Sequence, residues 1–202
     1  PRDHNEPNRG IVNRQFPATL FTNHEQQNLV LNDLLERLLA VIPNFNRSAF
    51  SAVEWALCEI TDNVTNHSKS SIGGLLQLSV FDIATKKVEF TVSDAGVGVA
   101  QTLREAKPKI SSDIDALMQS VRSGVTRNAV DYQGNGLYGT LEICRAGKGR
   151  FTLNAGHAAL ICVNGMVNAK AESTPFIGTT VDAHIDFSEP QLLEKALSIN
   201  GI

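Results

Sequence analysis

The chain has 202 residues, 42% of them hydrophobic, which is enough for one domain with a well-buried core. Its net charge of −3 comes from interspersed acids and bases, and this argues against nucleic acid and anionic membranes as partners. No apolar run approaches the length of a membrane span, and the polar start does not resemble a signal peptide. Cys58, Cys144 and Cys162 have no metal-ligand spacing, so we expect reduced core cysteines in an intracellular, cytoplasmic protein.

Two long helices are predicted early in the chain. Between residues 24 and 42, leucines recur at the three- and four-residue spacing of an amphipathic helix. They are Leu31, Leu34, Leu35, Leu38 and Leu39. A second apolar pattern begins near Phe50, and the preceding Asn46 or Ser48 suits the N-cap position. We expect this second helix to continue as far as His67.

The rest of the chain alternates between strands and helices. The predicted strands are residues 75–83, 88–93, 150–155, 158–164 and 178–187. We expect Gly156 to lie in the turn of a second hairpin and residues 165–176 to form a loop. Helices are predicted over about residues 136–146 and 189–198. The mostly polar stretch 101–133, which has only short helical patches, is typical of a mobile lid.

This order of elements predicts an α+β fold. Two helices, a hairpin, a lid, a third helix, further strands and a last helix suit a two-layer sandwich. In such a fold, helices cover one face of a mixed, mostly antiparallel sheet. We expect residues 1–22 to form a linker with an edge strand, and residues 23–202 to form a single domain.

The end of the second helix carries the first candidate site. Glu59, Asn63 and His67 are four residues apart, so an α-helix would place them in one row beside the apolar stripe. A carboxylate one turn from an amide oxygen suits a hard cation such as Mg²⁺ and an attacking water. Taken alone, such a row is more often the exposed face of an ordinary amphipathic helix.

The sequence Asp94-x-Gly96-x-Gly98 follows directly after an apolar strand. An ionised aspartate only accepts hydrogen bonds, so it can receive one from an exocyclic amine such as that of adenine. The glycines allow the backbone to approach a ligand closely or to adopt positive φ. The alternative is a tight turn with a capping aspartate, which is common.

A second glycine-rich run, Gly134-Asn135-Gly136-Leu137, opens a predicted helix. The free N–H groups and positive dipole end of such a start suit a phosphate chain, although a glycine pair there can also cap the helix or hinge the lid. The run is neither a Walker A loop nor a Rossmann fingerprint, since it lacks the Gly-Lys-Ser/Thr ending and the βαβ context. Thr179 offers a hydroxyl to water or a base edge, or is simply a β-branched strand residue.

These four elements occur in an order that resembles the GHKL ATPase superfamily, which includes gyrase B subunits, large heat-shock chaperones, histidine kinases and mismatch-repair ATPases. The resemblance covers about residues 50–187. It implies a Bergerat α/β sandwich that binds ATP and Mg²⁺, with Glu59 as general base and Asn63 as the Mg²⁺ ligand. The nucleotide-binding residues that it implies are Asn63, Asp94, Gly96, Gly98, Gly134, Asn135, Gly136, Leu137 and Thr179. Asp94 would bind adenine directly, and Thr179 would bind it through water.

The sequence departs from the family pattern at Asn66 and Tyr138, and in a smaller way at Val64, where many members have alanine. Tyr138 stands where many members have their next glycine, and Gly139 lies beyond it. This difference bears on the geometry of a closed lid more than on nucleotide binding. Asn66 stands where histidine kinases often carry a basic residue near the phosphates, and Lys69 or Arg127 is a candidate for that role.

Three functions are consistent with the resemblance. The first is slow ATP hydrolysis or phosphoryl transfer in bacterial regulation, as in the anti-sigma-factor serine/threonine kinases. It implies a regulatory protein partner and leaves a homodimer open. The second is an ATP-gated interaction switch without significant turnover. The third is the catalytic domain of a sensor histidine kinase, for which His24 only faintly echoes a phosphoacceptor box because the usual proline is missing. We expect the first.

Overall fold

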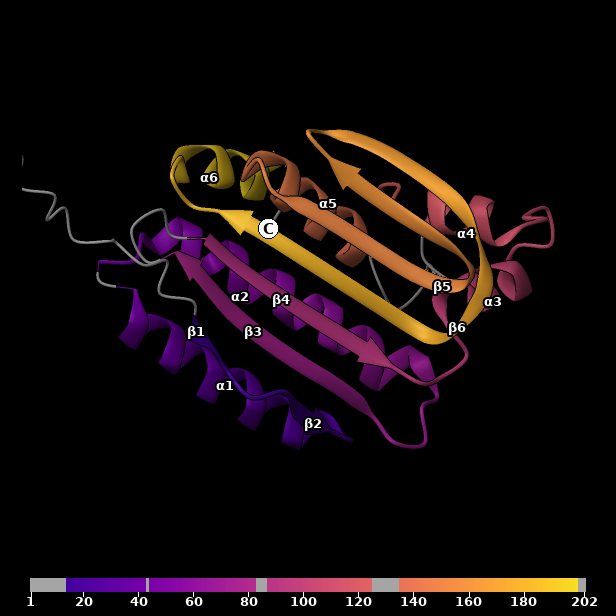
Figure 1. The fold of residues 1–202 in the computed structure, drawn as a ribbon, viewed down its shortest axis with the longest axis horizontal. Coiled ribbons are helices and arrows are strands. Elements are labelled where there is room, and N and C mark those ends of the chain that lie inside the picture. The colour runs from indigo at the N-terminus through magenta and orange to yellow at the C-terminus, as the bar shows by residue number, and fades with distance from the viewer. Residues whose placement is uncertain (1–13, 43, 83–86, 125–134, 200–202) are drawn as a thin grey trace, which may run out of the picture.

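The structure, a computed structural model, describes residues 14–42, 44–82, 87–124 and 135–199 (Figure 1). Its helices are α1 (His24–Val41), α2 (Arg47–Asn63), the π-helical turn η1 (Val64–Ser68), α3 (Val99–Ala106), α4 (Asp113–Ser120), α5 (Gly136–Ala146) and α6 (Pro190–Ile199). Its strands are β1 (Arg14–Gln15), β2 (Thr19–Phe21), β3 (Gly74–Asp82), β4 (Lys87–Asp94), β5 (Arg150–Val163) and β6 (Met166–Asp186). The fold is α+β, as the order of elements predicts.

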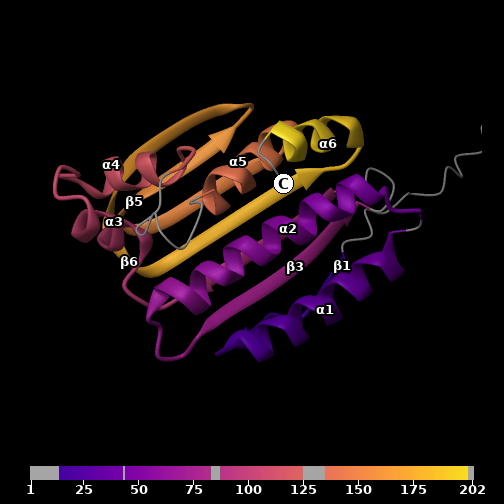
Figure 2. The same cartoon turned by 180° about the vertical axis from the view of Figure 1, so that it is seen from behind.

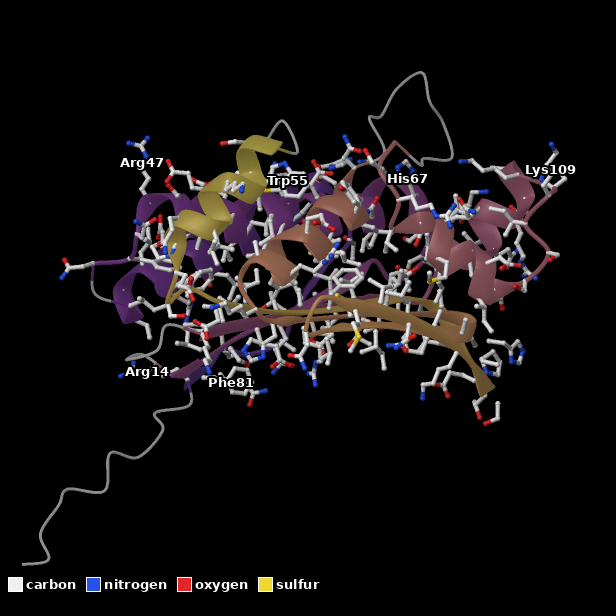
Figure 3. The ribbon with its side chains drawn as sticks, turned by 90° about the horizontal axis from the view of Figure 1, so that it is seen from above. Arg14, Arg47, Trp55, His67, Phe81 and Lys109 are labelled. Carbon is white, nitrogen blue, oxygen red and sulfur yellow. The ribbon has the colours of Figure 1, made fainter. Side chains whose placement is uncertain are left out.

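A six-stranded open sheet forms one layer of the molecule. Its order is β1-β3-β4-β6-β5, β2 also pairs with β3, and every pairing among the described strands is antiparallel. In β4, Val88, Phe90 and Val92 are buried, whereas the alternate residues Glu89 and Thr91 are half-exposed. Helices α2, α5 and α6 cover the same face of the sheet (Figures 2 and 3). The core therefore lies between one helical layer and one sheet.

The two N-terminal helices form as predicted. Four of the predicted leucines of α1 are buried: Leu31, Leu34, Leu35 and Leu38. Leu39 is 48% exposed, because it follows Leu38 by one residue and so points to the next face of the helix. Asn46, rather than Ser48, caps α2, since its side chain accepts a hydrogen bond from the Ala49 N–H at 3.1 Å. Among the described residues, no helix has the length and apolar character needed to cross a bilayer.

The last hairpin is longer than predicted. β5 runs without a break through Gly156, and β6 begins at Met166 and so occupies all but the first residue of the range 165–176 that we expect to be a loop. The turn lies at Asn164-Gly165, where φ is 50° and 75°, and Asn-Gly is a favoured pair for such two-residue turns. Gly156 has a φ of 58° and marks a register shift that bends β5. The predicted hairpin around Gly156 is wrong because a bulge and a turn both favour glycine at positive φ.

The first part of the predicted lid is packed rather than open. The stretch 101–133 contains most of α3 and all of α4, and their Leu103, Ala116 and Leu117 belong to the hydrophobic core. Helix α4 packs against β5. Residues 125–133 lie outside the described part of the chain, so a lid remains a prediction there.

Candidate functional site

The end of α2 and the start of α5 meet at Gly136. A Cβ atom added to Gly136 would lie 2.7 Å from Glu59 Oε2 and 3.6 Å from Asn63 Nδ2. The first of these distances is shorter than real Cβ contacts, so any side chain here would displace the Glu59 carboxylate. Three predicted site residues from distant parts of the sequence therefore share one small region.

The environment of Glu59 favours its neutral form. The side chain is half-buried, and this burial, together with the nearby Asp62 carboxylate, raises the pKa of Glu59 above its ordinary value of 4.5. A carboxylate with a raised pKa is a better proton acceptor than an exposed one. The group is therefore suited to general-base chemistry next to the start of α5.

The first turn of α5 lacks a side-chain cap. Asn135 is the N-cap residue, but its side chain makes no capping hydrogen bond. Its Oδ1 instead accepts a hydrogen bond from the Gly124 N–H at 3.0 Å. The first-turn N–H groups of α5 are thus not satisfied by this cap, and such groups favour an anion. Leu137 is half-buried against the core, and Gly134 lies outside the described residues.

Asp94 ends β4 as a buried carboxylate that holds the loop following it. Its Oδ1 accepts a hydrogen bond from the Gly96 N–H at 2.7 Å, and the Thr179 backbone N–H donates to the same carboxylate. Burial raises the pKa of Asp94, and these two hydrogen bonds oppose the rise. Because a carboxylate has about four acceptor positions, these donors leave capacity for a ligand donor.

Three glycines let backbone segments cross at this point. A Cβ atom on Gly96 would lie 1.9 Å from Ser68 O, and one on Gly178 would lie 2.1 Å from Asp94 O. Gly98 and Gly178 also have positive φ, 77° and 89°, and a Cβ on Gly98 would lie 2.6 Å from Gly178 O. The loop after β4, the end of η1 and the middle of β6 therefore meet without side chains between them.

Thr179 caps α3 from a different part of the chain. Its Oγ1 accepts a hydrogen bond from the Val99 N–H at 3.0 Å, whereas the N-cap residue Gly98 has no side chain to do so. Next to it, the hydroxyl groups of Thr180 and Ser93 are 2.6 Å apart across the β4–β6 pair. The Thr179 hydroxyl still has its own proton to donate, and its contact with a base stays a prediction.

The predicted row of Glu59, Asn63 and His67 is interrupted. The α-helix ends at Asn63, and residues 64–68 form a π-helical turn with a different residue spacing. His67 therefore does not continue the four-residue spacing, and it lies beyond α2 on the helical side of the molecule (Figure 3). Lys69, in the left-handed conformation with φ of 55°, ends the turn and is exposed. Arg127 is outside the described residues.

Sequence reasoning missed a buried polar cluster beside this turn. The Gln27 side chain is 2% exposed, and its Nε2 donates to Thr61 Oγ1 at 3.0 Å and to Asp62 Oδ1 at 2.5 Å. The Thr65 hydroxyl donates to Gln27 Oε1 at 3.0 Å. The signal for it was available, since Gln27 lies four residues before Leu31 on the apolar stripe of α1.

A second missed contact joins α5 to α2. A Cβ atom on Gly139 would lie 2.3 Å from the Trp55 ring, so this glycine is needed for the two helices to approach so closely. The glycine run at the start of α5 thus has two uses. Gly136 leaves room beside Glu59, and Gly139 provides helix packing one turn later.

The chain matches no protein-family model, and it matches no curated protein.

Proposed function

We propose that the chain is a GHKL-type domain that binds Mg²⁺-ATP and slowly hydrolyses it or transfers its γ-phosphoryl group in regulation. The observation that carries the proposal is the contact of Gly136 with Glu59 and Asn63. It joins a proton acceptor, an amide and a helix start whose N-cap side chain is turned away. These are the parts that phosphoryl transfer needs, because it depends on positioning and electrostatics more than on covalent chemistry by the protein.

The donor set fits a magnesium ion that is shared with phosphates. Asn63 offers an amide oxygen, and the described residues contain no group of three histidine, cysteine, aspartate or glutamate side chains placed to hold a metal. Mg²⁺ commonly keeps several waters and takes phosphate oxygens as further ligands, so it does not require such a group. When bound, the ion would neutralise charge on the phosphates. The N–H groups at the start of α5 would bind the same phosphates.

Asp94 is the residue that would bind the nucleobase. Its carboxylate is buried, fixed by the Gly96 N–H, and has acceptor capacity left for an exocyclic amine. Thr179 is fixed by the Val99 N–H and retains a hydroxyl proton for a bridging water. Glu59, in turn, would orient and deprotonate the attacking group near the phosphates.

The test follows radiolabelled γ-phosphate from ATP with Mg²⁺, measuring both free phosphate and label on protein. Glu59→Gln should lower turnover by about a hundredfold or more while preserving ATP affinity. Glu54→Gln is the matched control, because Glu54 is an exposed carboxylate on the same helix. Unchanged turnover in Glu59→Gln would contradict the catalytic role.

ATP binding is measured separately by calorimetry. Asp94→Asn should weaken it by about tenfold or more, since the acceptor for the amine is partly replaced by a donor. Asp33→Asn on the exposed face of α1 is the control. Absence of ATP binding by the unmodified chain would overturn the proposal. Binding without turnover would favour the ATP-gated switch, in which the Thr179–Val99 hydrogen bond connects the base site to α3.

A further inference from the structure

A cavity lies beside the loop that follows Asp94. It has a volume of about 230 Å³ and is bounded by α3, the start of α4, the bend of β5 and residues 175–178 of β6. Gly96 and Gly178 form part of its wall, whereas Glu59, Asn63 and Asp94 do not line it. At less than about 300 Å³ it is smaller than the usual site for a drug-sized ligand, so its ligand would be small.

The cavity is lined by an ion pair whose cationic side chain is exposed and whose anionic side chain is largely buried. Arg104 Nε lies 3.1 Å from Asp113 Oδ1, and Asp113 Oδ2 accepts a hydrogen bond from the His157 N–H at 2.8 Å. The Asp113 side chain is only 9% exposed, and its Oδ1 is buried without an aligned hydrogen bond. The Arg104 side chain is 42% exposed. Asp113 is therefore placed to orient the guanidinium rather than to meet a ligand.

The orientation of Arg104 leaves its outer edge available. In the part of the chain that the structure describes, its ion pair to Asp113 uses Nε, and its two terminal nitrogens form no hydrogen bond. A guanidinium edge held in this way matches the two oxygens of a carboxylate. Because Asp113 is fixed by His157 and packs against Gly156, little side-chain freedom would be lost on binding.

Part of the cavity wall is apolar and uncovered. Pro175, Phe176 and Ile177 line it from β6, and Val97 lines it from the loop. Phe176 is 38% exposed and Ile177 is 74% exposed, so both have apolar surface available to a ligand. The cavity thus combines one oriented cation with an apolar surface.

We propose that this cavity is a binding site for a small organic carboxylate with an apolar body, held by Arg104 and covered by Phe176 and Ile177. The carboxylate would accept hydrogen bonds from the terminal nitrogens of Arg104, and its apolar part would pack on the β6 segment. Gly96 is the one residue that this cavity shares with the residues assigned to ATP, and the proposed ligand contacts of Arg104, Phe176 and Ile177 lie outside that set.

The probes are 3-phenylpropanoate and its uncharged amide, titrated against the ¹⁵N-labelled full chain. Saturable shifts are expected for the backbone amides of Val97, His157 and Ile177 with the carboxylate, and at least tenfold weaker binding with the amide. Arg104→Gln should weaken carboxylate binding by about tenfold or more. Arg145→Gln is the matched control, since Arg145 is 43% exposed, is also ion-paired and lies on α5.

Gly156→Ala provides an independent test of the orientation of Arg104. Its added Cβ would lie 2.4 Å from Asp113 Oδ2, so it should weaken binding without removing any ligand contact. A peptide ending in phenylalanine with a free carboxylate distinguishes the source: tighter binding than 3-phenylpropanoate would indicate a chain terminus, and weaker binding a free molecule. The proposal is overturned if the carboxylate gives no saturable shifts at these amides, or if folded Arg104→Gln binds it as well as the parent does.

Discussion

Gln27 Nε2 on α1 donates a hydrogen bond of 2.5 Å to Asp62 Oδ1 at the end of α2. Asp62 is the neighbour of Asn63, and its charge is one reason for the raised pKa of Glu59. The same amide group also joins Thr61 and Thr65, so α1 is fixed to both sides of the candidate Mg²⁺ ligand. The first helix therefore belongs to the support of the site.

Replacing Gln27 by leucine should destabilise the fold by about 2–3 kcal/mol, because the buried Thr61 and the half-buried Asp62 and Thr65 would each lose a hydrogen bond. Urea denaturation followed by circular dichroism measures this difference. Asn32→Leu, an exposed amide on the same helix, should change stability by less than about 0.5 kcal/mol. Equal effects of the two substitutions would contradict the importance of the Gln27 cluster.

Gly139→Ala should lower the free energy of unfolding by about 1–3 kcal/mol, because the new methyl group overlaps the Trp55 ring. Since Trp55 is the single tryptophan, its fluorescence spectrum should change in the same variant. A double-mutant cycle with Trp55→Ala isolates the contact. When Trp55 is already alanine, Gly139→Ala should destabilise the fold no more than an ordinary helical substitution does. An equally large loss of stability would show that the steric overlap is not with Trp55.

Thr179→Val should lose the acceptor for the Val99 N–H and destabilise α3 by about 1 kcal/mol. Hydrogen exchange of the Val99 amide should accelerate accordingly. Thr179→Ser keeps the hydroxyl and should retain the protection of that amide. If both variants protect it equally, the hydroxyl does not cap the helix.

Glu59→Gln should raise the melting temperature at about pH 7.5. Burial and the Asp62 charge raise the pKa of Glu59, so the folded chain binds this proton more tightly than the unfolded chain does. The stability contributed by Glu59 therefore falls as pH rises from below 4.5 through the raised pKa. The increase in melting temperature of Glu59→Gln should disappear below this pH range, at about pH 4. Glu54→Gln, which replaces an exposed carboxylate, should show no comparable dependence.

Periodicity predicted most of the elements that carry the site. The spacing of the leucines in α1 and the alternation of apolar residues in β4 each indicate one buried face, and such a face can be predicted from local spacing alone. The run Asp94-x-Gly96-x-Gly98 likewise predicted close backbone approach or positive φ, and the structure places Gly96 against Ser68 O and gives Gly98 a φ of 77°. These contacts were predictable in kind because few other residues tolerate such proximity.

The missed features depend on partners that are distant in sequence. Gln27 is a polar residue on an apolar stripe, but nothing local shows that Thr61 and Asp62 satisfy it 34 and 35 residues away. The π-helical turn after Asn63 has no sequence signature in the helical pattern. Gly156 and Asn164-Gly165 offered two plausible turns, and only pairing with β6 decides between a bulge and a hairpin.

The antiparallel seam between β4 and β6 has a kinetic consequence. It pairs Lys87 with Asp186 and Ser93 with Thr180, so it closes a loop that contains nearly half of the chain. The β3–β4 and β5–β6 hairpins are local and carry a smaller entropic cost, and we expect them to form before the seam. Asp94 meets Gly178 at the end of that seam. The proposed base site would then be completed in the last step of folding, and only a chain that has finished folding would bind a base there.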